Sequence, residues 1–376
     1  MKSKFVKAGL LLMMFVIMTA LSACGGGAGG ESAGGNEDAG AETEAATVAE
    51  PNSGIGDIVY AIPDGWEASV VTAGSYVNYK NSASEYELYT SIMSEESVKD
   101  TTYYDAEDKE IEINSIQDYY DKIVVASAET LKKSNIVQEK INICGHDGVY
   151  TKRQDANGKN AYFLSTAWVD GDKAYIVGFS RADNWDKGKI KEDAVALTED
   201  EIKMYEAVIA SIQKGDGEAF AAQSIKADSI GEFAFVAPEN YTAVSSDDRT
   251  INFEKNDNEN IGITIDRVTE EGLKMYAYSV DDKPIETLDE YYTQFFGDGD
   301  ETTIAGCEAK IRKYPDENDK YRYVSAVIKT DEAAYEISMG VSDIWDEEGN
   351  IKPDAEALSE EDLATFDAFL EGITKK

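Results

Sequence analysis

The chain has 376 residues, of which 74 are acidic and 35 are Lys or Arg, so its formal net charge is −39. A polyanion of this size is repelled by phosphate backbones, and we therefore expect no nucleic-acid partner. A hydrophobic content of 42% excludes a wholly disordered acidic chain, and three cysteines are too few for a disulfide scaffold. We expect compact domains that are held together by burial alone.

The first 23 residues are typical of a signal peptide. Three lysines among the first seven residues precede an apolar run from Ala8 to Leu21, which is short for a bilayer span of about 20 residues. The run ends in Leu21-Ser22-Ala23-Cys24-Gly25. This order resembles the signal of bacterial lipoproteins. The resemblance implies cleavage before Cys24, acylation of Cys24 with fatty acids such as palmitate, and anchoring to the cell membrane on its extracytoplasmic side. An uncleaved anchor with an incidental cysteine is the alternative.

Residues 24–53 are predicted to comprise the lipidated Cys24 and a flexible acidic linker rich in glycine and alanine. From Gly25 to Glu50 the composition is glycine, alanine, serine, threonine and acid with a single asparagine, and Val48 is the one sizeable aliphatic residue. Such a segment has too little apolar surface to form a core.

A repeated stretch organises the remainder of the chain. Ile55–Trp66 is an alternating apolar strand closed by a proline turn, and Ile230–Tyr241 has the same pattern. The segments that follow each copy also correspond. We therefore predict one domain over residues 54–214, a connector over 215–228 and a second, homologous domain over 229–376.

In the first copy we expect mainly strands, with two helices. Ser115 has the pattern of a helix N-cap, and Thr198-Glu199-Asp200-Glu201 is a capping box before a second helix. The polar segment over 101–112 is predicted to be an exposed loop. The predicted strands are Tyr76–Lys80, Glu85–Met93, Val137–Ile143, Val149–Gln154, Ala161–Val169 and Lys173–Ser180.

The second copy repeats this plan. Thr287 and Ser359 stand where Ser115 and Thr198 stand, and each has the pattern of a helix cap. Ile304-Ala305-Gly306-Cys307 corresponds to Ile143-Cys144-Gly145-His146, so the two hairpins should match residue for residue. Tyr335–Val341 alternates between apolar and polar residues, which predicts a half-buried strand.

The order of elements resembles the PsbP-like family, which is shared with the Ran-binding Mog proteins. The matching residues are Ile62–Trp66, Gly145 and Ile209–Ile212 in the first copy, and Ala237–Tyr241, Gly306 and Leu370–Ile373 in the second. The resemblance implies an α+β fold of two tandem α/β/α sandwich domains, each a mainly antiparallel sheet flanked by helices. It implies no activity, because the family's members have diverse roles.

The sequence offers weak candidates for catalysis, and we expect a protein that is not an enzyme. His146 is the only histidine, and it lies in a predicted hairpin tip, Cys144–Gly148, which is a poor place to exclude water. Ser211-Ile212-Gln213-Lys214 has the Ser-x-x-Lys form without its companion motifs. The acidic turns Asp257–Asn260 and Asp298–Glu301 lack the spacing of a calcium loop. We therefore predict no cofactor and no metal site.

Two tryptophan–aspartate pairs recur before the last helix of each copy. Trp185-Asp186 and Trp345-Asp346 are the candidate binding residues, and they could form a paired aromatic site for a glycan or a partner protein. The alternative is that each tryptophan fills the edge of the sandwich and each aspartate begins a turn.

These observations favour a membrane-anchored extracytoplasmic lipoprotein with duplicated, non-catalytic binding modules. Its partners would be the membrane, through the lipid on Cys24, and an envelope protein or glycan. A solute-binding lipoprotein of a transport system is the first alternative, and a cell-wall or peptide hydrolase is the second.

Overall fold

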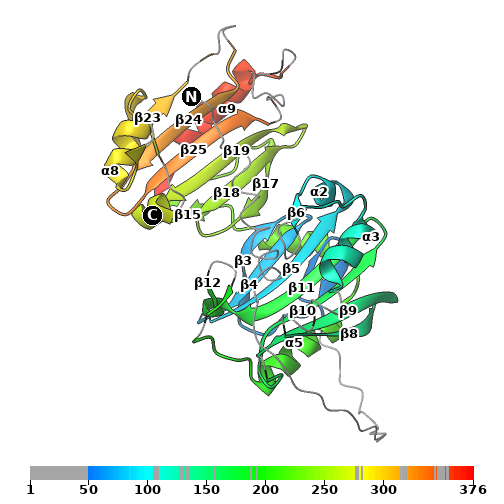
Figure 1. Ribbon diagram of the computed structural model, residues 1–376. Coiled ribbons are helices and arrows are strands. Elements are labelled where there is room, and N and C mark those ends of the chain that lie inside the picture. Colours follow the sequence, from blue (N-terminus) through cyan, green and yellow to red (C-terminus); the bar gives the residue numbers. More distant parts are fainter. Residues whose placement is uncertain are drawn as a thin grey trace, which may run out of the picture. The chain divides into compact units, whose positions relative to one another are not determined.

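The computed structural model describes residues 50–83, 85–104, 110–126, 131, 135–155, 157–186, 189–191, 193–275, 279–280, 283–313, 315, 320–342, 344, 352 and 355–376 (Figure 1). The predicted signal peptide, Cys24 and the linker as far as residue 49 lie outside these ranges. The described residues form two compact units: the first contains residues 50–68 and 73–223, and the second contains residues 224–376 together with the short stretch 69–72. Within the described ranges, no helix is long and apolar enough to cross a membrane.

The first unit contains an antiparallel sheet with the strand order β3-β4-β5-β11-β10-β9-β8. The strands predicted from alternation are confirmed within about three residues at each end. Their bounds are β3 (Trp66–Thr72), β4 (Tyr76–Asn81), β5 (Tyr86–Ser94), β8 (Ile136–Ile143), β9 (His146–Gln154), β10 (Ala161–Asp170) and β11 (Lys173–Arg181).

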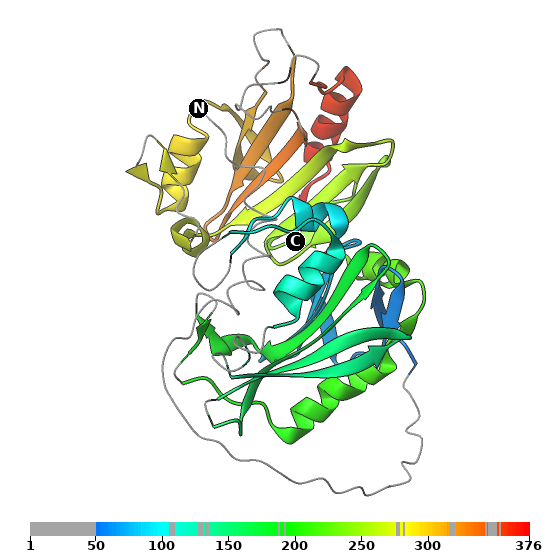
Figure 2. The same cartoon turned by 45° about the vertical axis from the view of Figure 1, so that its right-hand side comes forward.

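Helices pack on both faces of this sheet (Figure 2). One face carries α2 (Glu95–Lys99), α3 (Ile116–Tyr119) and the π-helix η1 (Tyr120–Val124), whose apolar residues cluster with Ala167 and Ile176. The other face carries α5 (Glu199–Ser211), from which the Tyr205 hydroxyl donates to the Val177 carbonyl at 2.9 Å. Both predicted caps are confirmed, because Ser115 accepts from the Asp118 amide and Thr198 accepts from the Glu201 amide.

Short elements complete the first unit and correct one prediction. The segment over 101–112 is not simply an exposed loop: β6 (Tyr103–Tyr104) pairs with β7 (Glu110–Ile111), and Tyr103 is only 1% exposed because it packs under α3. The remaining elements are β1 (Ser53–Ile55), β2 (Ile58–Tyr60), η2 (Ala182–Asn184), β12 (Trp185–Asp186), β13 (Lys189–Ile190), β14 (Gln213–Lys214) and α6 (Gly217–Ser224).

The predicted connector contains helix α6, which docks on the first unit. Gly217 approaches the Ile58 carbonyl so closely that an added Cβ would lie 2.0 Å from that oxygen. A carboxylate oxygen of Glu218 accepts from the Gly56 amide at 3.3 Å. The first unit therefore extends to about residue 223.

The second unit repeats the connectivity of the first. Its sheet has the order β17-β18-β19-β25-β24-β23-β22, which is the same arrangement element by element. Its strands are β17 (Tyr241–Ser246), β18 (Thr250–Lys255), β19 (Asn258–Val268), β22 (Asp300–Ile304), β23 (Cys307–Arg312), β24 (Tyr323–Lys329) and β25 (Ala334–Val341). The duplication seen in the sequence thus includes the order in which the strands pair.

The helices of the second unit also correspond to those of the first. The capping boxes predicted at Thr287 and Ser359 are both present. A π-helix directly follows the helical turn capped by Ser115 in the first unit and the turn capped by Thr287 in the second, so this wider turn belongs to the shared architecture. The further elements are α7 (Glu270–Met275), α8 (Leu288–Glu290), η3 (Tyr291–Phe295), α9 (Glu360–Glu371), β15 (Ser229–Ile230), β16 (Phe233–Ala234), β20 (Ser279–Val280), β21 (Lys283–Pro284) and β26 (Thr374–Lys375).

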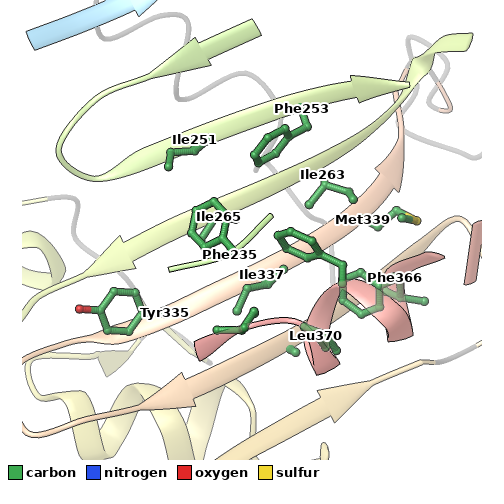
Figure 3. Packing of buried hydrophobic residues seen from close by; sticks show 14 of the residues in the cluster. Phe235, Ile251, Phe253, Ile263, Ile265, Tyr335, Ile337, Met339, Phe366 and Leu370 are labelled. Atoms are coloured by element: carbon green, nitrogen blue, oxygen red, sulfur yellow. The ribbon is translucent and has the colours of Figure 1, made fainter. Parts of the chain in front are cut away.

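The main core of the second unit lies between α9 and one face of its sheet (Figure 3). Phe366 and Leu370 of α9 pack with Ile337 and Met339 of β25, and all four side chains are at most 4% exposed. A smaller cluster on the opposite face contains residues of α7, α8 and η3. The sheet therefore has helices on both faces, which confirms the α+β class.

The hairpins at Cys144 and Ala305 match as predicted. Ile143 pairs with His146, and Ile304 pairs with Cys307. Both residues between the strands have positive φ in each hairpin, 51° and 88° in the first copy and 50° and 78° in the second. This backbone geometry is that of a tight two-residue hairpin, in which glycine is favoured at the second position.

Substitution of Phe366 by alanine should destabilise the second unit by about 3–5 kcal/mol, because it removes a fully buried aromatic ring and leaves a cavity. Chemical denaturation followed by fluorescence measures this change. Glu361→Ala, at an exposed position of the same helix, is the control and should change stability by no more than about 0.5 kcal/mol. Equal effects of the two substitutions would contradict the assigned packing of α9.

Candidate functional site

Trp185, predicted as a binding residue, lies partly buried against the first sheet. Its Nε1 donates to the Ser180 hydroxyl at 3.3 Å, and the Phe163 ring meets it edge-on at 5.9 Å between centroids. The Arg153 guanidinium stacks on its ring at 5.6 Å. One ring face is therefore covered by protein, which favours the packing role over an open aromatic platform.

The other predicted binding residues are only partly placed. The backbone of Asp186 pairs with Lys189 between β12 and β13, and its side chain lies outside the described part of the structure. Trp345 and Asp346 lie outside the described residues altogether. A paired tryptophan site therefore stays a prediction.

The residues around His146 form a surface cluster at the end of the first sheet. The His146 Nε2 lies 3.4 Å from the Asp170 carboxylate, and the Lys214 ammonium contacts the same carboxylate. The Cys144 thiol donates to the Ile212 carbonyl at 3.4 Å. Burial raises the pKa of this thiol, so its protonated, poorly nucleophilic form is favoured. Within the described ranges no group of three or more His, Cys, Asp or Glu side chains is placed to hold a metal ion.

On the side opposite α9, beside the part that α7, α8 and η3 cover, the second sheet presents a polar surface, which we call the open face. Along β18, β19 and β25 every second side chain packs towards α9, and the alternate side chains are only half-buried. A surface of this kind can meet a ligand while the core behind it stays closed. The open face comprises Thr250 and Asn252 of β18, Thr264 and Asp266 of β19, Tyr323 of β24, and Glu336 and Ser338 of β25.

Hydrogen bonds between side chains order this face across the strands. The Asn252 amide donates to the Ser245 hydroxyl at 2.7 Å, and its oxygen accepts from the Thr264 hydroxyl at 2.8 Å. The Thr250 hydroxyl donates to the Asp266 carboxylate at 2.6 Å. These bonds fix the rotamers, so the face is preorganised.

Glu336 lies at the centre of the open face and accepts two phenolic hydrogen bonds. The Tyr323 hydroxyl donates to one carboxylate oxygen at 3.0 Å, and the Tyr291 hydroxyl of η3 donates to the other. Burial raises the pKa of this carboxyl group, and the nearby charge of Asp266 raises it further, against the lowering effect of the two hydroxyls and of Arg312.

Asp266 is the direct cross-strand neighbour of Glu336 in the pairing of β19 with β25. Its pKa is also raised, mainly by burial and to a smaller extent by the charge of Asp247, while Thr250 and Arg249 act in the opposite direction. Within the described part of the chain, neither carboxylate lies within ion-pair distance of a lysine or arginine. Two like charges directly opposite each other in a sheet are destabilising.

Tyr323 places an accessible aromatic ring next to the acid pair. Its ring passes so close to Gly340 that an added Cβ there would lie 3.1 Å from the ring carbon. The absence of a side chain at Gly340 lets the ring lie along β25 and reach Glu336. With 50% of its surface exposed, Tyr323 leaves much of its ring available to a ligand.

The acid pair belongs to the second unit alone. The Tyr175 hydroxyl lies beside Gly56 in the first unit, and the Tyr335 hydroxyl lies beside Gly231 in the second. The two tyrosines therefore occupy equivalent positions in their sheets. With this alignment and the strand registers, the counterparts of Asp266, Glu336 and Tyr323 are Ser91, Ile176 and Phe163. The two copies have kept one fold and diverged on this face.

Sequence reasoning missed these residues for a specific reason. Glu336 was placed correctly on the polar side of an alternating strand, yet Asp266 lies 70 positions earlier in the chain, and alternation alone does not say which residues pair across strands. A comparison of the two copies could have indicated the pair, because Asp266 and Glu336 stand where the first copy has Ser91 and Ile176. Chemically, such a pair can share a proton or receive a cationic group.

Comparisons with known proteins leave the chain without an assigned relative. No protein-family model and no curated protein matches it. A crystal structure from Bacteroides thetaiotaomicron VPI-5482 is similar at 13% identity and a TM-score of 0.22, over 49% of this chain and 51% of the other, so the chain spans about half the length of that protein. The Tle4–Tli4 complex matches at 9% identity and a TM-score of 0.25, over 83% of this chain and 97% of the other. TM-scores this low carry no argument about fold or function.

Asp266→Asn should stabilise the second unit at neutral pH by about 0.2–1 kcal/mol, because it removes one of two opposed like charges and keeps an oxygen for Thr250. A carboxyl group whose pKa is raised on folding favours folding when protonated. Stability of the native protein should therefore fall as pH rises from the ordinary carboxyl range through the raised pKa values, and the variant should lose less.

Denaturant titrations at several pH values measure this difference. Asp300→Asn, at an exposed position of β22, is the matched control and should leave the pH profile unchanged. An Asp266→Asn profile that superimposes on the native one would contradict coupling between the two carboxylates.

Proposed function

We propose that this protein is a lipid-anchored extracytoplasmic protein whose two PsbP-like modules bind a protein or glycan of the cell envelope without catalysing a reaction. The observation that carries the binding role is the open face of the second sheet, where half-exposed polar side chains and Tyr323 are held in fixed positions over a closed core. The order of lysines, apolar run and Cys24 supports the anchor.

The surroundings of the nucleophilic and basic residues support binding over catalysis. His146 lies at a hairpin end beside charged, partly exposed partners, where water has access. The Cys144 thiol is held in its protonated form by burial. Neither arrangement resembles the water-excluded, activated nucleophile that covalent catalysis needs.

A hydrolase is the alternative that one observation favours. A carboxyl group with a raised pKa, such as Glu336, is suited to general acid catalysis. However, both of its oxygens accept hydrogen bonds from tyrosines. A hollow of about 730 Å³ in the same unit is lined by residues 225–231 with Asp247 and Asp248, and Glu336 is not among its lining residues. We therefore favour binding, and the solute-binding lipoprotein is a variant of that proposal with a small ligand.

Cys24→Ala should release the protein from membranes, because acylation of this thiol is the proposed anchor. Fractionation of cells into membrane and soluble material measures the change, and Cys144→Ala is the matched control that should stay with the membranes. Equal membrane fractions for the native chain and the Cys24→Ala variant would contradict a lipid anchor at this residue.

A photoreactive phenylalanine analogue at position 338, on the open face, should capture a specific envelope partner when the full-length protein is expressed in cells. The same analogue at position 361, an exposed site on α9, is the control and should give no such adduct. Mass spectrometry of the adducts identifies the partner. The same weak set of adducts from both positions would count against the open face as a binding surface.

A further inference from the structure

We propose that the open face of the second sheet binds a lysine-containing segment of a partner protein, with the lysine ammonium placed between Tyr323, Glu336 and Asp266. This inference rests on the proposed binding function and names the chemistry of its partner. It concerns the second unit alone.

Charge complementarity is the first argument. Asp266 and Glu336 face each other across neighbouring strands and, within the described ranges, neither has a lysine or arginine at ion-pair distance. The charges that act on them from neighbouring elements are Arg312 of β23 for Glu336, and Arg249 and Asp247 for Asp266. Among the described residues neither arginine forms an ion pair with the two acids, so the pair lacks a positive group in direct contact. An incoming cation would supply it on a chain whose net charge is already −39.

The Tyr323 ring selects a cation that has an alkyl stem. An ammonium group over a tyrosine face gains cation–π attraction, and the methylene stem of lysine packs on apolar surface. The same unit shows this recognition internally, because the ring of Tyr292 carries Lys310 at 4.8 Å and Lys329 at 5.6 Å. Among the described residues Tyr323 has no such partner, and its ring is half-exposed.

The geometry of the sheet explains why a peptide segment fits. The open face extends over β18, β19 and β25 as far as Tyr323 at the start of β24, with hydroxyl and amide groups of Thr264, Ser338 and Asn252 beside the acids. A protein segment can lay its backbone on these hydrogen-bonding groups while one side chain reaches the acids. The ordered rotamers reduce the entropy lost on binding.

Fluorescence anisotropy with a short, labelled peptide that alternates lysine with glycine tests this inference on the mature full-length chain at low ionic strength. The double variant Asp266→Asn, Glu336→Gln should bind the peptide about tenfold more weakly than the native chain, because both counter-charges are lost. The control Asp300→Asn, Glu301→Gln makes the same change in net charge on β22 and should stay within about twofold.

Three further readouts separate this site from diffuse attraction. A peptide with acetylated lysines should lose binding to the native chain. Tyr323→Phe should retain most of the affinity and Tyr323→Ala should lose it, since the ring is needed more than the hydroxyl. Affinity should rise with pH through the titration of the acid pair, because the ammonium replaces a proton there. Circular dichroism checks the fold of each variant. If the double variant does not fold, the loss of binding in Tyr323→Ala is the deciding measurement.

The inference is overturned if the two double variants bind equally, or if the acetylated peptide binds as tightly as the lysine peptide. Failure of this inference differs from failure of the proposed function. A partner captured at position 338 without lysine-dependent binding would leave the function standing and remove the inference. Lysine-dependent peptide binding without any captured partner would leave the inference standing and count against the proposed function.

Discussion

The structure depends on the packing of one amphipathic helix against one face of a twisted antiparallel sheet, and this arrangement occurs twice. In the second unit α9 places Phe366, Phe369 and Leu370 against the alternate apolar residues of the sheet. In the first unit α5 does the same with Tyr205, Val208 and Ile209. Because side chains of a strand alternate between faces, this packing commits half of each strand to the main core, and the other half faces the smaller helices in part and is otherwise free to vary. The acid pair lies on this second face.

The two units use that freedom differently. The first unit places aromatic groups there, with Trp185 held by Ser180, Phe163 and Arg153. The second unit places two carboxylates next to each other under a half-exposed tyrosine, an arrangement that opposes folding at neutral pH. A duplicated fold can tolerate such a pair because the main core is on the other face. We infer that this acid pair receives a cationic group from a binding partner.

Local sequence signals predicted local structure well. The four helix caps at Ser115, Thr198, Thr287 and Ser359 were all correct, since a cap is decided by a few neighbouring residues. The hairpins at Cys144 and Ala305 were also correct. The burial of Tyr103, the docking of α6 and the two π-helices were missed, because each depends on packing that no short window of sequence contains. The acid pair was missed for the same reason, since the register of β19 against β25 brings together distant parts of the chain.

The central claim, that β25 turns one set of side chains into the α9 core and the alternate set towards the half-exposed open face beside η3, can be tested with single thiols in a background where Cys144 and Cys307 are replaced by serine. Ser338 and Ile337 are neighbours on β25 with side chains on opposite faces. A thiol at position 338 should react with a maleimide at a rate close to that of an exposed site, and a thiol at position 337 should be strongly protected in the folded protein. Equal reactivity at the two positions would contradict the account.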